Sequence, residues 1–127
     1  MVSKVKNSKT ILIVEDESSL NEAYQIILNK AGYEVLSAFD GEEALAIVAK
    51  QKPDLILLDL RMPIMNGIEF LKHYQPSKKN RAKIIVFSNY DLQQEIEEAY
   101  KLGADKYILK AWASPKELLK IVKDILK

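Results

Sequence analysis

The sequence contains no cysteine and only one histidine, His73, in 127 residues. The absence of cysteine excludes disulfides, thiolate metal sites and cysteine nucleophiles. A single histidine excludes sites that need two, such as most zinc hydrolase arrangements. An excess of charge of one sign is also lacking, because 19 basic residues stand against 18 acidic ones and leave a net charge of +1. No global field therefore recruits a nucleic acid or an anionic membrane, and any function must come from a local site.

Long apolar runs are missing as well. No stretch approaches the roughly 18 residues of a membrane span, and no apolar segment of signal-peptide length follows the basic N-terminus. We therefore expect no membrane segment and no export, and the lack of cysteine suits a cytoplasmic location. Repeats and Pro/Gly-rich linkers are absent too. The chain is predicted to be one domain over residues 1–127, with its core from about residue 10 and a polar extension at 1–9.

The sequence does contain short apolar runs that alternate with longer segments of helical periodicity. This alternation predicts five strand–helix units, a parallel sheet and helices on both of its faces. Ser114, with Pro115 at the first helical position and Glu117 three residues after the cap, is a clear helix start. Strands are expected at 10–14, 33–39, around 55–58, 82–88 and 105–110, and helices from 17 or 18 to 31, at 40–51, 66–74 and 92–103, and from 114 to the end.

Polar residues collect where the expected strands end. The carboxyl ends of parallel strands share one rim, and ligands bind there. Glu15 and Asp16 follow the first strand, Asp59 follows the third, and Ser88 and Lys110 end the fourth and fifth. Three carboxylates and one lysine have a formal charge of −2, and mutual repulsion raises the pKa of some of the carboxyls. A divalent cation would offset that charge. All the available ligands are oxygen donors, which favours Mg²⁺ or Mn²⁺. Mg²⁺ also accepts phosphate oxygens as ligands.

Four segments together resemble a known family over essentially the whole chain: "ILIVEDE", "DLILLDLRMPIMNG", "FSNYD" and "ADKYILK". The chain resembles the receiver domain of two-component response regulators. The resemblance implies a doubly wound, flavodoxin-like α/β fold with strand order 2-1-3-4-5. It also implies a phosphorelay signalling module, not an enzyme, that takes a phosphoryl group from a sensor histidine kinase, a phosphotransfer protein or a small phosphodonor.

The resemblance assigns the acidic residues their roles. Asp59 matches the phosphoacceptor, whose carboxylate is the nucleophile and whose product is an acyl phosphate. Asp59 and Asp16 match ligands of Mg²⁺, and Glu15 matches an outer acidic position that acts through a water. The backbone carbonyl of Arg61 matches the remaining protein ligand.

The resemblance also implies a switch. Lys110 matches the lysine that pairs with the phosphoryl oxygens, Ser88 the hydroxyl that bonds them, and Tyr107 the aromatic residue that turns inward as Ser88 moves. The added charge of about −1.5 to −2 would then change the surface of the fourth helix, fifth strand and fifth helix, through which a homodimer could form.

Two positions are implied to set the lifetime of the phosphoryl group, and one segment departs from the family pattern. Arg61 and Tyr90 stand two residues after Asp59 and Ser88, beside the path of the hydrolytic water; both are bulky, which predicts a long-lived phosphoryl group. The family lysine is usually followed by proline through a cis peptide, but Ala111 and Trp112 follow it here, which leaves the geometry of that loop open.

Two features lie outside the implied site. Trp112, if exposed, is a candidate partner contact. The basic segment 77–83 is expected to be a solvated loop, with docking to an acidic partner left open.

Three other readings compete with a phospho-accepting receiver. An aspartyl-phosphate phosphohydrolase would need a carboxylate two residues after its nucleophile, where Arg61 stands. A flavodoxin-like cofactor binder would need a phosphate-cradling loop after the first strand, where "EDESSL" is acidic. A pseudo-receiver scaffold that works without phosphorylation would usually lose Asp59 or Lys110, and both are present.

Overall fold

The computed structural model describes residues 8–127, so most of the expected polar extension lies outside the described residues. Five parallel strands form one sheet in the order β2-β1-β3-β4-β5, which confirms the predicted topology. The strands are β1 (Thr10–Val14), β2 (Glu34–Ala38), β3 (Leu55–Leu58), β4 (Lys83–Ser88) and β5 (Lys106–Leu109).

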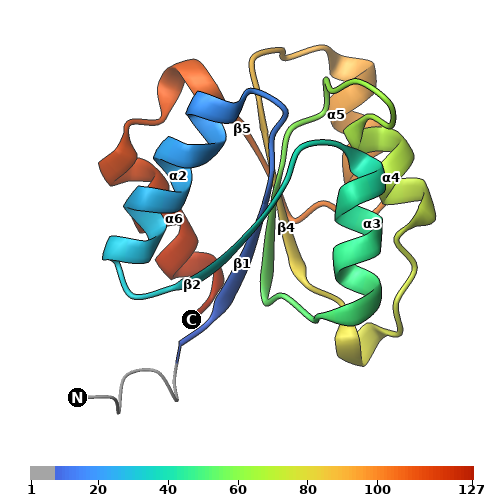
Figure 1. The fold of residues 1–127 in the computed structure, drawn as a ribbon. Helices are drawn as coiled ribbons and strands as arrows, with labels where there is room; N and C mark the ends of the chain where they lie inside the picture. The colour runs from blue at the N-terminus through green and yellow to red at the C-terminus, as the bar shows by residue number, and fades with distance from the viewer. Residues whose placement is uncertain (1–7) are drawn as a thin grey trace.

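Helices cover both faces of this sheet, as the alternating pattern predicts. In Figure 1, α2 and α6 lie on one side of the strands, and α3, α4 and α5 lie on the other. The α-helices are α2 (Ser18–Lys30), α3 (Gly41–Lys50), α4 (Gly67–His73), α5 (Gln93–Lys101) and α6 (Pro115–Ile125). Two short 3₁₀ turns, η1 (Lys78–Asn80) and η2 (Lys110–Trp112), were not expected from the sequence. The start of α6 is confirmed, since Ser114 and Glu117 form a reciprocal capping box.

The side chains of each strand divide between two cores. Alternate residues of β1, β3 and β4 pack against α2 and α6 on one face, and the residues between them pack against α3, α4 and α5 on the other. Phe70 and Leu71 of α4 fill one core, and Leu118 and Val122 of α6 fill the other. Burial on both faces explains why the central strands are continuous apolar runs instead of alternating ones.

Asn21 is a fully buried polar residue of α2 that the sequence pattern did not single out. Its side-chain amide donates to the backbone carbonyls of Glu15, at 2.9 Å, and Ala38, at 3.2 Å. Its own oxygen accepts from Gln25 at 2.8 Å. Asn21 therefore ties α2 to the carboxyl ends of β1 and β2, at the same rim where the polar residues collect.

Asn21→Ala is expected to destabilise the fold, because it removes the side-chain donor of the Glu15 carbonyl and one of the two donors of the Ala38 carbonyl. The loss should be about 1–3 kcal/mol in the free energy of unfolding, measured by urea denaturation. Asn29→Ala, at an exposed position of the same helix, is the matched control and should change stability by less than about 0.5 kcal/mol. Equal effects of the two substitutions would contradict the anchoring role.

Candidate functional site

The register of the sheet brings the predicted acidic residues together. Val14 pairs with Leu58, so Glu15 and Asp59, one residue further along each strand, emerge side by side. Each of Glu15, Asp16 and Asp59 offers a carboxylate oxygen, and these oxygens all lie within 4.8 Å of one another. With Lys110, Arg61, Tyr90, Glu17 and Asn89, these residues line a cavity of about 390 Å³.

Asp59 sits at the base of this cavity and is only 8% exposed. Its backbone N–H donates to Val14 O at 3.0 Å, which continues the β1–β3 ladder, and its Oδ1 accepts the N–H of Arg61 at 3.3 Å. Gly67 begins α4 directly against it, because a Cβ at Gly67 would lie 2.5 Å from the carbonyl oxygen of Asp59. The absence of a side chain at Gly67 therefore allows the helix to close on this backbone.

Lys110 reaches past β4 to both buried carboxylates. Its Nζ lies 2.6 Å from Glu15 Oε1 and 3.4 Å from Asp59 Oδ2. The side chains of all three residues are at most 10% exposed. The sequence indicated Lys110 and Asp59 as partners, but it did not predict that Glu15 would hold the lysine more closely. Asp16, in contrast, is exposed to solvent.

The charges of this cluster are only partly balanced. Burial raises the pKa of the Asp59 carboxyl, and the positive charge of Lys110 only partly opposes this. Burial also raises the pKa of Glu15, against the hydrogen bond from Lys110. For Lys110, burial acts to lower the pKa, but the Glu15 hydrogen bond and the charge of Asp59 outweigh it and the pKa is raised. Each partner thus holds the lysine protonated, while one cation does not fully offset the two buried carboxylates.

The donor set fits a hard divalent cation. Three carboxylates that converge within 4.8 Å provide oxygen ligands alone, which is the chemistry that Mg²⁺ and Mn²⁺ prefer. Asp16 forms no ion pair with another described residue and faces solvent, so its carboxylate is available. The raised pKa values of Glu15 and Asp59 indicate that additional positive charge would stabilise both ionised carboxylates.

Ser88 ends β4 and Tyr107 lies in β5, and among the described residues neither forms a hydrogen bond with Asp59. Ser88 is fully buried, and its Oγ accepts the N–H of Tyr90 at 3.1 Å. Tyr107 is half-buried, and its hydroxyl donates to the carbonyl of Tyr90 at 2.9 Å. Among residues 8–127, no hydrogen bond joins Ser88 to Asp59 or Lys110. The loop at Tyr90 therefore connects the hydroxyl and the aromatic residue that the sequence assigned to the switch.

Arg61 covers one side of the cavity through contacts that the sequence did not predict. Its guanidinium carbon lies 4.2 Å from the centre of the Tyr90 ring, and its Nη2 lies 3.0 Å from Glu95 Oε2. Glu95 belongs to α5, far along the chain, and no motif or spacing marked it. The three side chains join the loop after β3 to the loop after β4, and we call them the Arg61–Tyr90–Glu95 cluster.

The loop after Lys110 and the tryptophan that it carries are also defined. The described residues contain no cis peptide bond, so the Lys110–Ala111 bond is trans. Trp112 is 77% exposed and helps to line an apolar cavity of about 510 Å³ between α5, β5 and α6, together with Tyr100 and Tyr107. Trp112 therefore meets the condition of exposure on which the predicted partner contact depended, and the contact itself stays a prediction.

Replacement of Asp59 by Asn is expected to stabilise the metal-free protein, with a defined pH dependence. Because the folded-state pKa values of Asp59 and Glu15 lie above the ordinary 3.8 and 4.5, the folded state binds protons more tightly than the unfolded chain. The wild type therefore gains stability as pH falls from 7 towards 4.5. The Tm advantage of Asp59→Asn, measured with EDTA by circular dichroism, should shrink over this range. A difference that is independent of pH would contradict the assignment.

Comparison with known proteins agrees with this geometry. The family model described as "Response regulator receiver domain" matches residues 11–123. The chain is 39% identical over 120 residues to the alkaline phosphatase synthesis transcriptional regulatory protein PhoP of Bacillus subtilis, a match that covers 94% of this chain and 49% of that protein. It is 38% identical over 97 residues to sporulation initiation phosphotransferase F of the same organism, which covers 76% of this chain and 77% of the relative. The chain thus spans about half the length of the first of these relatives.

Solved structures give the same result. A CheY-like receiver domain protein from Methanospirillum hungatei superposes with a TM-score of 0.85 at 33% identity, and the match covers 94% of each chain. The chemotaxis protein CheY4 of Vibrio cholerae also gives a TM-score of 0.85, at 32% identity, over 94% of this chain and 99% of that one. With the matched family model and the shared strand order, these likenesses show that the chain belongs to the response regulator receiver domain family of two-component systems.

Proposed function

We propose that this receiver domain, a single unit over residues 1–127, accepts a phosphoryl group on Asp59. A carboxylate oxygen of Asp59 attacks the phosphorus of a phosphohistidine, and the phosphorus–nitrogen bond breaks. The electron pair returns to the imidazole of the donor, which then takes a proton from water. The observation that carries the proposal is the buried Asp59 carboxylate beside Lys110, at the base of a solvent-open polar cavity.

The chain's own residues position the reaction. The N–H of Arg61 holds one oxygen of Asp59, which leaves the other on the side of Lys110, 3.4 Å away. Lys110 supplies a positive charge for the phosphoryl oxygens, and Glu15 orients that lysine before transfer. Mg²⁺ or Mn²⁺, held by Asp16, Asp59, the Arg61 carbonyl and Glu15 through a water, would neutralise further charge on the phosphoryl group.

The proposed output is a change at the surface of α5, β5 and α6. Ser88 Oγ accepts the N–H of Tyr90 and keeps its own hydroxyl proton to donate to a phosphoryl oxygen, so we expect Ser88 to move towards the phosphoryl group. That movement disturbs the loop whose carbonyl holds the Tyr107 hydroxyl, so Tyr107 is free to turn inward. The apolar cavity beside Trp112 then changes shape, and a homodimer or a target protein would bind on this surface.

The proposed partner is a sensor histidine kinase or a phosphotransfer protein, with no direct binding of nucleic acid by this domain. Of the helices between residues 8 and 127, none has both the length and the apolar content that a bilayer crossing needs. Because its proposed partner is a histidine kinase or a phosphotransfer protein, we propose that the domain acts in the cytoplasm. We also propose that it is not an enzyme but a phosphorylated signal carrier that slowly dephosphorylates itself.

Incubation with acetyl phosphate and Mg²⁺ should add one phosphoryl group, detected by intact mass. Asp59→Asn should lose the labelling, and so should wild type in EDTA. Asp91→Asn removes an exposed carboxyl outside the cavity and should be labelled like the wild type. Labelling that persists in Asp59→Asn, or the absence of labelling by acetyl phosphate and by a cognate kinase alike, would refute the phosphoacceptor proposal.

The Arg61–Tyr90–Glu95 cluster should slow loss of the phosphoryl group, because it covers the approach of water to Asp59. The double variant Arg61→Asn/Tyr90→Glu should dephosphorylate about tenfold faster, which corresponds to about 1.4 kcal/mol of barrier. Glu95→Gln should accelerate dephosphorylation less, since it removes only the ion pair that holds Arg61. Rates are measured by the decay of the phosphorylated mass.

The matched control for this cluster is Lys72→Gln, which removes an exposed ion pair with Glu98, at 3.6 Å, outside the cavity. Its dephosphorylation rate should equal that of the wild type. If the Arg61 and Tyr90 substitutions also leave the rate unchanged, the cluster does not control the phosphoryl lifetime.

A further inference from the structure

A second polar cavity, of about 320 Å³, lies at the end of the sheet opposite Asp59. It is bordered by the segment before β1, the loop before β3, the turn and loop before β4, and the end of α6. Three of its basic residues belong to the segment 77–83, which the sequence left as a solvated loop or an acidic-partner site. The basic residues of the lining are Lys9, Lys52, Lys79, Arg81, Lys83 and Lys127.

Positive charge is concentrated around this cavity far beyond what the composition predicts. The lining holds six basic side chains and one acidic side chain, Asp54, which gives a net side-chain charge of +5. The whole chain has a net charge of only +1, so the remaining side chains together carry −4. A balanced composition therefore conceals a strongly polarised molecule, with the acidic cluster at one end of the sheet and the basic cavity at the other.

The lysines of this cavity have no counter-ions within the described part of the chain. None of the five forms an ion pair with a carboxylate of residues 8–127. The one carboxylate of the lining is already engaged, since Asp54 Oδ2 accepts the N–H of Thr10 at 2.8 Å. Arg81 is also engaged, with its Nη2 donating to Leu102 O at 3.0 Å and its guanidinium 5.2 Å from the Tyr74 ring. The five lysines are therefore exposed cations without a carboxylate partner among the described residues.

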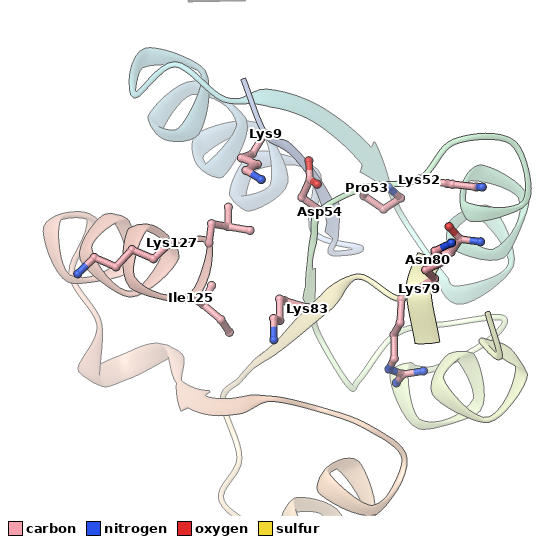
Figure 2. A pocket seen from close by; sticks show the side chains of 11 residues that line it. Lys9, Lys52, Pro53, Asp54, Lys79, Asn80, Lys83, Ile125 and Lys127 are labelled. Carbon is pink, nitrogen blue, oxygen red and sulfur yellow. The ribbon is translucent and has the colours of Figure 1, made fainter. Parts of the chain in front are cut away.

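The backbone beneath these lysines is fixed by hydrogen bonds. Asp54 N–H donates to Thr10 O at 2.8 Å, and Lys83 N–H donates to Asp54 O at 3.0 Å. Figure 2 shows Lys9 and Lys83 near Asp54 around the opening, while Lys52 and Lys127 extend away from it. Lys9 and Lys83 are thus the two lysines that lie near Asp54 in this view.

We propose that this basic cavity binds the di- or triphosphate group of a small molecule. Ammonium groups on flexible stems donate to phosphate oxygens without a fixed planar geometry, and several such groups suit a ligand with several charges. The cavity volume lies at the lower end of the range for small-molecule sites, which favours a short phosphate chain over a protein surface. The molecule that carries these phosphate groups is either a free polyphosphate or a nucleotide. The site is separate from Asp59, so its test does not depend on the proposed phosphoryl transfer.

The test is calorimetric titration of the protein with tripolyphosphate, in parallel with ATP, at low ionic strength and with EDTA to remove divalent cations. Both ligands should bind, and ¹⁵N amide shifts should move at Lys9, Asp54 and Lys83 but not at Asp59. Tighter binding of ATP would identify a nucleotide, and equal binding would identify the phosphate chain alone. Lys9→Gln/Lys83→Gln should weaken binding about tenfold.

The control is Lys116→Gln/Lys120→Gln, which removes the same charge from exposed positions of α6 outside the cavity. Its affinity for tripolyphosphate should match that of the wild type. Equal weakening by both double variants would show a general charge effect and would overturn the proposal. The proposal also fails if neither phosphate ligand binds at millimolar concentration, or if a poly-glutamate peptide binds more tightly than tripolyphosphate.

Discussion

The ion pair of Lys110 with Glu15 and Asp59 is the constraint on which the rest of the site depends. Two carboxylates that emerge side by side from β1 and β3 are almost fully buried, and the cost of burying each charge without a partner amounts to several kcal/mol. Lys110 follows β5, which is two strands from β3 and three from β1, and it reaches both carboxylates. The register of three strands, the close approach of Gly67 and the anchor at Asn21 all serve to hold this arrangement.

The charge of the two buried carboxylates is only partly compensated, and the proposed function depends on that. The raised pKa values of Glu15 and Asp59 show that the metal-free cluster retains a cost of ionisation. A better balanced cluster would be more stable, but it would have less need of a divalent cation, and its lysine would be less available to a phosphoryl group. The uncompensated charge at this rim lowers the stability of the fold, and the same charge is the physical basis of the proposed reactivity of Asp59.

The sequence predicts the fold because its apolar runs and helical stripes do not overlap and each maps onto one element. It also predicts most of the site, since strand ends in a parallel sheet share a rim, and Glu15, Asp16, Asp59 and Lys110 all fall there. It does not predict that Glu15 takes the closer contact with Lys110, because that depends on the side-chain reach of residues far apart in the chain. Glu95 and Asn21 were missed for the same reason, since their partners come from distant segments and no local pattern marks them. The basic cavity was only partly indicated, because the segment 77–83 supplies three of its basic residues and the others come from distant segments.

The central claim is that the buried carboxylate of Asp59, and no other group, becomes the acyl phosphate. Reductive trapping tests it at the level of a single residue, because borohydride converts an aspartyl phosphate into homoserine and leaves free carboxylates intact. Protein phosphorylated with acetyl phosphate and Mg²⁺, reduced, digested and sequenced by mass spectrometry should contain homoserine at position 59 alone. Homoserine at Asp16, a reduced product at Glu15, or a phosphoryl group that survives reduction on His73 would contradict the account.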